Sequence, residues 1–313
     1  MLKEQEYYTI LNTYFIEKNE LLFEKAREKC KNMCFSHNDE QLNKILNITN
    51  EIERKYEFNM QNMCKNNYQL LTLFQIEIMG SVSIVHRKKA LEFLIACCLA
   101  DKILDSRRFK QREKISVMKL LTLNYKKDEL KREFNILANF INDIIEFLSF
   151  YGDKNKKGYL HELIEAAFKS EIYMSSFEIN ENERFLQKDN YLLIDKSVAF
   201  EKSALLLSLN EKYLDREVKL ADVIGKIMWL SDDLCDLFQD LSAKRKNSLL
   251  YINMPEKKLK IDERVKLFYS NLPNIIADLE SYMSELENLC STDLYYFVIN
   301  IIEKWFSDIK VMI

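Results

Sequence analysis

Glycine and proline are scarce in this sequence, with only four glycines and two prolines among 313 residues. Globular proteins usually contain roughly 7% glycine and 5% proline. Because tight hairpin turns depend on these residues, an architecture built from many short strands and turns is excluded. The apolar share of 48% is large enough for a sizeable core. The composition therefore predicts a globular all-α protein.

An excess of charge of either sign is also missing. The 46 Lys and Arg residues nearly balance the 49 Asp and Glu residues, which leaves a formal net charge of −3. No segment is basic enough to follow a phosphate backbone, so nucleic acid is not expected as a partner. The seven cysteines, an odd number, lie mostly within helical patterns rather than at the spacings of a disulfide framework. We expect free thiols in a reducing cytoplasm.

Long apolar runs are absent too. No uninterrupted apolar stretch approaches the roughly 18 residues of a membrane-spanning helix. Lys3, Glu4 and Glu6 place charges where a secretory signal would be apolar. We therefore expect a cytoplasmic protein with no stable membrane insertion.

The apolar pattern repeats at about 3.6 residues along nearly the whole chain, and the alternation typical of strands is almost absent. Short polar or proline-containing stretches interrupt it at 151–158, 177–183, 253–258 and 271–274. None of them is long enough for a linker between domains, so we predict a single helical domain over residues 1–313. The predicted helices are 4–30, 38–60, 64–79, 83–108, 112–123, 127–150, 157–177, 190–209, 216–243, 262–286 and 291–311.

Two of these helices are more apolar than a surface helix requires, and both end in aspartates. They are "VSIVHRKKALEFLIACCLADKILD" at 82–105 and "KLADVIGKIMWLSDDLCDLF" at 219–238. Helices that are apolar on several faces belong at the centre of a bundle. Carboxylates at the ends of two central helices therefore call for a compensating cation.

The aspartates are spaced so that each helix presents one acidic stripe. Asp232, Asp236 and Asp240 follow one another at intervals of four residues, as do Asp101 and Asp105. At that spacing successive carboxylates lie about 6 Å apart along one helix face, and they repel each other. An all-oxygen cluster suits Mg²⁺, which retains waters and phosphate oxygens in its coordination shell, so a phosphorylated substrate is implied. The alternative is a solvated helix face without a metal.

Basic residues follow each acidic stripe. Arg107 and Arg108 come directly after the first, and Arg245 and Lys246 after the second. Guanidinium and ammonium groups bind phosphate oxygens, so these side chains are candidates for the remaining charge of a phosphorylated ligand.

These stretches resemble the aspartate-rich motifs of trans-isoprenyl diphosphate synthases. "WLSDDLCDLFQD", with Lys246 fourteen positions after Asp232, resembles the second motif, and "ADKILD" resembles the first, with Lys102 in place of its second aspartate. The separation of 131 residues between Asp101 and Asp232 is close to that of the family, and "DKSVAF" at 195–200 stands where the family has a Lys-Thr-Gly segment. The resemblance covers roughly residues 80–250.

The resemblance implies a fold and a reaction. The family, and the class I terpene synthases that share its fold, are antiparallel helical bundles around a deep apolar cavity. Three Mg²⁺ ions bridge the diphosphate of an allylic substrate to the two aspartate-rich helices. Carried over, Asp101 and Asp105 would ligate two ions and Asp232 the third, while Lys196 and Lys246 would contact the diphosphate. A homodimer is expected from the resemblance alone.

The sequence motifs with which the family binds a second substrate are missing or displaced. Chain-elongating members bind isopentenyl diphosphate through a Gly-Gly-Lys segment, an arginine pair after the first motif and a Phe-Gln before the second. No Gly-Gly occurs here, the pair Arg107–Arg108 comes early, and Met228–Trp229 stands at the Phe-Gln position. This combination favours a class I terpene synthase, which ionises one prenyl diphosphate to a cyclic or linear terpene.

The resemblance also implies a set of metal ligands and residues of the cavity wall. Asp232, Asp236 and Asp240 have the one-five-nine spacing of the terpene cyclase metal triad. Trp229, one turn earlier, is a candidate for the cavity wall, where its ring would stabilise a carbocation, although an aromatic residue on an apolar helix is more often core. Small Ala96 and Cys97, one turn before Asp101, suggest a deep pocket for C20 or longer chains.

Three alternatives stay open. The first is a trans-prenyltransferase that condenses an allylic diphosphate with isopentenyl diphosphate or another acceptor. The second is a non-catalytic regulatory subunit of a prenyl diphosphate synthase. The third is a helical scaffold whose resemblance is accidental. The three histidines have neither metal-ligand spacing nor an evident nucleophile beside them, and we expect them to be structural.

Overall fold

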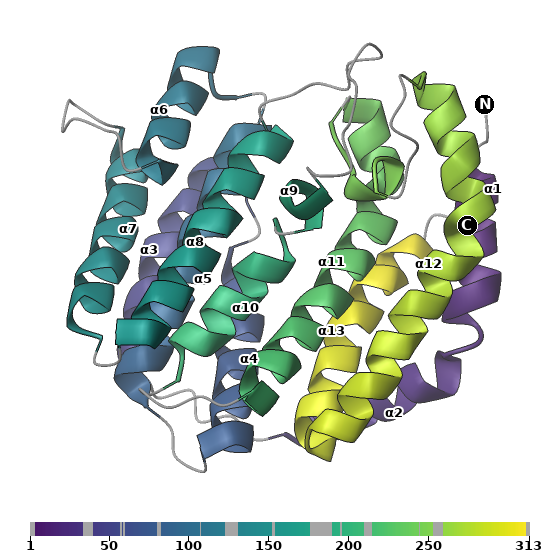
Figure 1. Ribbon diagram of the computed structural model, residues 1–313, viewed down its shortest axis with the longest axis horizontal. Coiled ribbons are helices and arrows are strands. Elements are labelled where there is room, and N and C mark those ends of the chain that lie inside the picture. Colours follow the sequence, from purple (N-terminus) through teal and green to yellow (C-terminus); the bar gives the residue numbers. More distant parts are fainter. Residues whose placement is uncertain are drawn as a thin grey trace.

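The computed structural model shows a bundle of long helices lying side by side in a largely antiparallel arrangement (Figure 1). Helices are the only regular structure in the described residues, which confirms the predicted all-α class. The structure describes residues 4–33, 40–56, 58, 60–79, 83–106, 108–122, 131–151, 154–175, 190–194, 196–209, 215–243, 245–252 and 259–310.

The helices follow the predicted periodicity closely. In chain order they are α1 (Glu4–Leu11), η1 (Asn12–Ile16, a π-helical turn), α2 (Glu20–Lys31), α3 (Glu40–Tyr56), α4 (Gln61–Met79), α5 (Ile84–Asp105), α6 (Gln111–Leu121), α7 (Arg132–Phe150), α8 (Lys154–Ser175), α9 (Asn190–Ile194), α10 (Val198–Leu207), α11 (Asp215–Ala243), η3 (Ser248–Leu250, a 3₁₀ turn), α12 (Ile261–Leu289) and α13 (Thr292–Lys310).

Three predictions about helix continuity were wrong. The helix expected over 4–30 is interrupted after η1, and the helix expected over 190–209 is two helices with Lys196 in the turn between them. The break expected at 271–274 does not occur, because α12 continues through Pro273. A proline inside a helix removes one hydrogen bond. Here the flanking Leu272 and Ile275 are buried, so packing of that face holds α12 together.

The two helices predicted to be central, α5 and α11, are separated by the shorter α10. Helix α10 packs against both of them. The approach to α11 is close at Gly225, where an added Cβ would lie 3.1 Å from the carbonyl oxygen of Val198. Only glycine permits this backbone separation, so Gly225 sets how near α10 lies to the aspartate helix.

The first helix of the chain braces α11 from the other side. The hydroxyl of Tyr7 donates a hydrogen bond of 2.7 Å to the carbonyl oxygen of Leu234, in the middle of the aspartate stretch. The Tyr7 ring is fully buried against Phe238 and Phe268, with centroid separations of 5.3 and 6.0 Å. Residues far apart in sequence thus fix the position of α11.

A cavity of about 290 Å³ lies between α6, α7 and α8. Its walls are mostly apolar side chains such as Ile141, Ile144 and Phe168, with His161 and Lys169 also lining it. This cavity is therefore on a different side of α5 from α11. The deep cavity beside the aspartates stays a prediction.

No helix in the described part of the chain is long and apolar enough to cross a bilayer.

Candidate active site

Arg245 joins the ends of the two aspartate helices. Its Nη1 donates to Oδ2 of Asp105 on α5, and its Nη2 lies 3.2 Å from Oδ1 of Asp240 on α11. Because one guanidinium reaches both carboxylates, the acidic ends of α5 and α11 face the same space. The structure thus brings together two stretches that lie more than a hundred residues apart in the sequence.

Lys196 neutralises the other carboxylate of α5. It lies in the turn before α10, with Nζ 2.9 Å from Oδ1 of Asp101 and 3.8 Å from Oε2 of Glu171 on α8. Desolvation alone would raise the pKa of Asp101, but the positive charges of Lys196 and Lys102 outweigh it and lower that pKa. Asp101 is therefore ionised and paired without any metal.

The carboxylates of α11 are less well compensated. Desolvation, together with the charges of Asp236 and Asp233, raises the pKa of Asp232 well above its usual value. Desolvation likewise raises the pKa of Asp236, and it raises that of Asp240 to about 7. Asp232 nevertheless remains exposed to solvent. A side chain that water reaches but protein surrounds is expected on the wall of a cleft, where an added cation would be favoured.

Asp233, the neighbour of Asp232, is hydrogen-bonded to the segment that follows α11. Its Oδ2 accepts hydrogen bonds from the hydroxyl and from the backbone N–H of Ser248, the latter at 3.2 Å. Asn247 donates to the carbonyl oxygen of Asp233 at 2.8 Å and to Oδ2 of Asp240 at 3.2 Å. Asp233 therefore ties the segment after α11, at Asn247 and Ser248, back onto the helix.

The predicted phosphate-binding cations are spread over different surroundings. Lys246 is only 5% exposed, and its Nζ lies 4.0 Å from the centre of the Tyr173 ring. Such a cation–π contact stabilises a charge in a partly buried place. Arg108 is exposed just after α5, and Arg107 lies outside the described residues. The structure therefore gathers Lys196 and Arg245 at the aspartates, with Lys246 held against an aromatic ring of α8.

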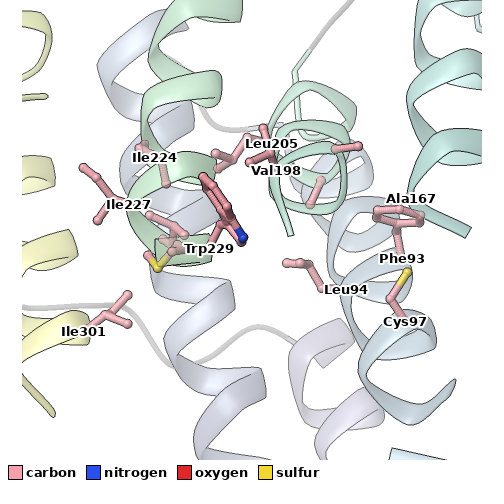
Figure 2. Packing of buried hydrophobic residues seen from close by; sticks show 14 of the residues in the cluster. Phe93, Leu94, Cys97, Ala167, Val198, Leu205, Ile224, Ile227, Trp229 and Ile301 are labelled. Carbon is pink, nitrogen blue, oxygen red and sulfur yellow. The ribbon is translucent and has the colours of Figure 1, made fainter. Parts of the chain in front are cut away.

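The three residues predicted for the cavity wall are in the core. Ala96 is fully buried, and Cys97 and Trp229 are each 7% exposed. Figure 2 shows the Trp229 ring extending from α11 toward Val198 and Leu205 of α10, while Cys97 lies farther off, near Phe93 and Ala167. Trp229 Nε1 donates a hydrogen bond of 2.7 Å to Ser248 Oγ. Trp229 is therefore anchored at one edge, and contact of these residues with a ligand stays a prediction.

The oxygen donors at this site are of the kind that Mg²⁺ requires, but Asp101, Asp105 and Asp240 are already paired with Lys196 or Arg245. Arg245 joins Asp105 to Asp240, and Asp232 and Asp236 interact electrostatically with Asp101, so the five carboxylates offer the oxygen donors that hard divalent cations prefer. Within the described ranges, however, no three acidic, His or Cys side chains form a preassembled metal cluster. Metal binding to α5 would require Lys196 and Arg245 to exchange their carboxylates for another anion, and a diphosphate offers such oxygens.

Several residues at this site gave no signal in the sequence. Glu171 and Tyr173 come from α8, where no motif marks them. The anchoring role of Asp233 depends on Ser248, whose position after the basic run only the fold reveals. The Asn247 side chain also accepts from the N–H of Leu249 and so caps η3, a local signal that the sequence does offer.

Comparison with known proteins gives structural matches only. No family model and no curated protein matches this sequence. The chain is similar to a geranylgeranyl pyrophosphate synthetase from Pyrococcus horikoshii Ot3, with 11% identity, a TM-score of 0.46, and coverage of 97% of this chain and 99% of that one. It is also similar to a heptaprenyl diphosphate synthase from Staphylococcus aureus, with 12% identity, a TM-score of 0.44, and coverage of 93% and 96%.

Proposed function

We propose that this protein is a Mg²⁺-dependent enzyme that ionises a linear allylic prenyl diphosphate. The observation that carries the proposal is the convergence of α5 and α11, with Arg245 between Asp105 and Asp240 and with Asp232 exposed beside them. Bound Mg²⁺, as many as three ions by family resemblance, would neutralise the diphosphate as it leaves. Lys196 and Arg245 are placed to bind phosphate oxygens, and the apolar helices beneath exclude water from a carbocation.

Among enzymes of this kind, we favour a class I terpene synthase. A condensing enzyme needs polar groups for a second diphosphate. At the position where its glutamine would stand, Trp229 is buried and its only polar atom is hydrogen-bonded to Ser248. That residue therefore offers nothing to isopentenyl diphosphate, and the absence of a Gly-Gly-Lys segment points the same way.

The test is incubation of the purified protein with C10 to C25 prenyl diphosphates and Mg²⁺, with and without isopentenyl diphosphate. We expect diphosphate release and hydrocarbon products that do not require isopentenyl diphosphate. Elongated diphosphates formed only with isopentenyl diphosphate would establish a trans-prenyltransferase instead. Asp232→Asn and Asp105→Asn should each abolish release, whereas Asp278→Asn, an exposed aspartate on α12, serves as the matched control.

One observation favours the non-catalytic alternative. Asp101 and Asp105 already contact Lys196 and Arg245, so protein cations compensate part of the charge of the α5 carboxylates. A regulatory subunit would need no more than this. It predicts no diphosphate release by the protein alone, no stabilisation by Mg²⁺ plus diphosphate, and recovery of activity only when a catalytic partner is added.

A further inference from the structure

Glu201 is a carboxylic acid inside the bundle that the proposed metal site does not use. It lies on α10, the helix between α5 and α11. Its Oε2 is buried and accepts no hydrogen bond from any described residue. An acid at such a place costs stability unless it meets a partner, and an apolar side chain would fill the space without that cost.

The position of Glu201 relative to the aspartates follows from its neighbours. Glu201 packs beside Gly225 of α11, where an added Cβ would lie 3.6 Å from the Glu201 Cβ. Gly225 precedes Asp232 by seven residues, a rise of about 10 Å. On α5, desolvation raises the pKa of the Cys98 thiol, and the nearby charge of Glu201 contributes to that shift. Cys98 lies about one turn before Asp101.

Glu201 therefore lies one to two helical turns below the carboxylates, on the apolar side. A prenyl diphosphate whose charged end is bound by Lys196, Arg245 and Mg²⁺ at the aspartates would extend its hydrocarbon in this direction. Glu201 and Cys98 are each partly accessible, whereas most side chains around them are buried. If the predicted cavity is present, the acid lies at the depth of the first isoprene units of a chain inside it.

We propose that Glu201 accepts the proton whose loss ends the reaction of the carbocation. This inference rests on the proposed function. A C–H bond next to the cationic carbon breaks, its electron pair forms the new C=C bond, and the proton moves to an oxygen of Glu201. The neutral acid then returns the proton to water or to the released diphosphate. No oxidant or further reactant is required.

Two physical properties suit Glu201 to this role. Desolvation raises its pKa to about 7, close to a working pH, where a general base is most effective. A carboxylate without a hydrogen-bond partner also attracts a cation more strongly than one that is already paired. The Glu201 carboxylate would first stabilise the positive charge of the carbocation and then accept its proton.

The experiment compares wild type with Glu201→Gln, which keeps the shape of the side chain but cannot take up a proton. Diphosphate release and hydrocarbon and alcohol products are measured for each, and Glu162→Gln, an exposed glutamate on α8, is the control. We expect Glu201→Gln to give about one tenth or less of the wild-type hydrocarbon per diphosphate released, with alcohols from water capture in its place. Glu201→Asp should recover part of the hydrocarbon yield.

A binding measurement tests the same point without turnover. A prenyl amine, added with inorganic diphosphate and Mg²⁺, carries an ammonium in place of the carbocation. We expect wild type to bind the amine about tenfold more tightly than Glu201→Gln, since the ammonium loses a charged hydrogen-bond partner. Thermal unfolding of each variant confirms that it is folded before either measurement.

The outcomes separate the two proposals. If wild type releases no diphosphate and binds no amine, the proposed function fails, and the role of Glu201 fails with it. If wild type is active while Glu201→Gln gives the same products and the same amine affinity, only the role of Glu201 is overturned.

Discussion

The carboxylates of α5 and α11 share a spacing but differ in the cations that they contact, although desolvation and the charge of Asp101 raise the pKa of Asp105 on α5 as well. On α5, Asp101 and Asp105 each contact a cation supplied by the protein. On α11, desolvation and mutual repulsion keep the pKa of Asp232 high, and only Asp240 reaches Arg245. Spacing along a helix therefore does not decide whether a stripe is satisfied. The neighbouring elements decide it, and α11 is the side on which an external cation has most to gain.

Removing Arg245 should have the largest effect, because it leaves both stripes uncompensated. Arg245→Met is expected to lower the free energy of unfolding by about 3 kcal/mol, since Asp105 and Asp240 lose their shared cation in a desolvated place and must either stay charged there or take up protons. Urea denaturation measures the loss, and Mg²⁺ with diphosphate should recover part of it. The control is Arg132→Met, which breaks an exposed ion pair with Glu51 and should cost no more than about 1 kcal/mol. Equal losses for the two variants would contradict the comparison.

Glu201 extends the comparison to an acid that pairs with no cation among the described residues. Its folded-state pKa is about 7 against a usual 4.5, so the folded protein holds more protons than the unfolded chain between these values. Stability therefore falls as the pH rises through that window. We expect Glu201→Gln to be more stable than wild type by about 2 kcal/mol near pH 8, after allowance for partial solvent screening, and equal to it below about pH 4.5. Thermal unfolding at both pH values checks the difference, and an equal gain at low pH would point to packing instead.

Replacing Lys196 should make the electrostatic surroundings of Asp101 on α5 resemble those of Asp232 on α11. Lys196→Met leaves Asp101 without its closest cation, and a loss of about 1–2 kcal/mol is expected at neutral pH. The lowered pKa of Asp101 contributes stability above the unfolded pKa and loses it as the pH falls through the folded value. The variant should therefore lose more stability near neutral pH than at about pH 3. A loss that does not change with pH would show that Lys196 acts through packing of its chain.

Neutralising Asp232 should have the smallest effect on the folded protein alone. Asp232→Asn relieves repulsion by Asp236 and is expected to stabilise it by a few tenths of a kcal/mol near neutral pH. Because the raised pKa of Asp232 makes stability fall with rising pH, this gain should disappear in acid. The variant should also lose most of the stabilisation that Mg²⁺ plus diphosphate gives wild type. Stabilisation equal to wild type would remove Asp232 from the metal site.

The sequence predicted the helices better than the contacts at their ends. Periodicity located α5 and α11 to within a few residues, because each buries a long apolar face. The four-residue spacing placed Asp232 rather than Asp233 on the acidic stripe, but it did not show that Ser248 folds back onto Asp233. The pairing of Lys196 with Asp101 depends on the turn between α9 and α10, which interrupts the helix predicted over 190–209. No local pattern sets that turn. Such partners are set by tertiary packing, which a single sequence does not display.

The hydrogen bond from Tyr7 to Leu234 has a consequence for the order in which the site can form during synthesis. It joins residues 227 positions apart, and the Tyr7 ring also requires Phe268 of α12 for its full burial. Contacts of such long sequence separation must wait until the later segment has been made. The aspartates of α11 therefore reach their final position only after the first turns of α12 have emerged from the ribosome. A nascent chain that has completed α11 but not yet begun α12 should bind Mg²⁺ and diphosphate poorly, although every proposed metal ligand is already present.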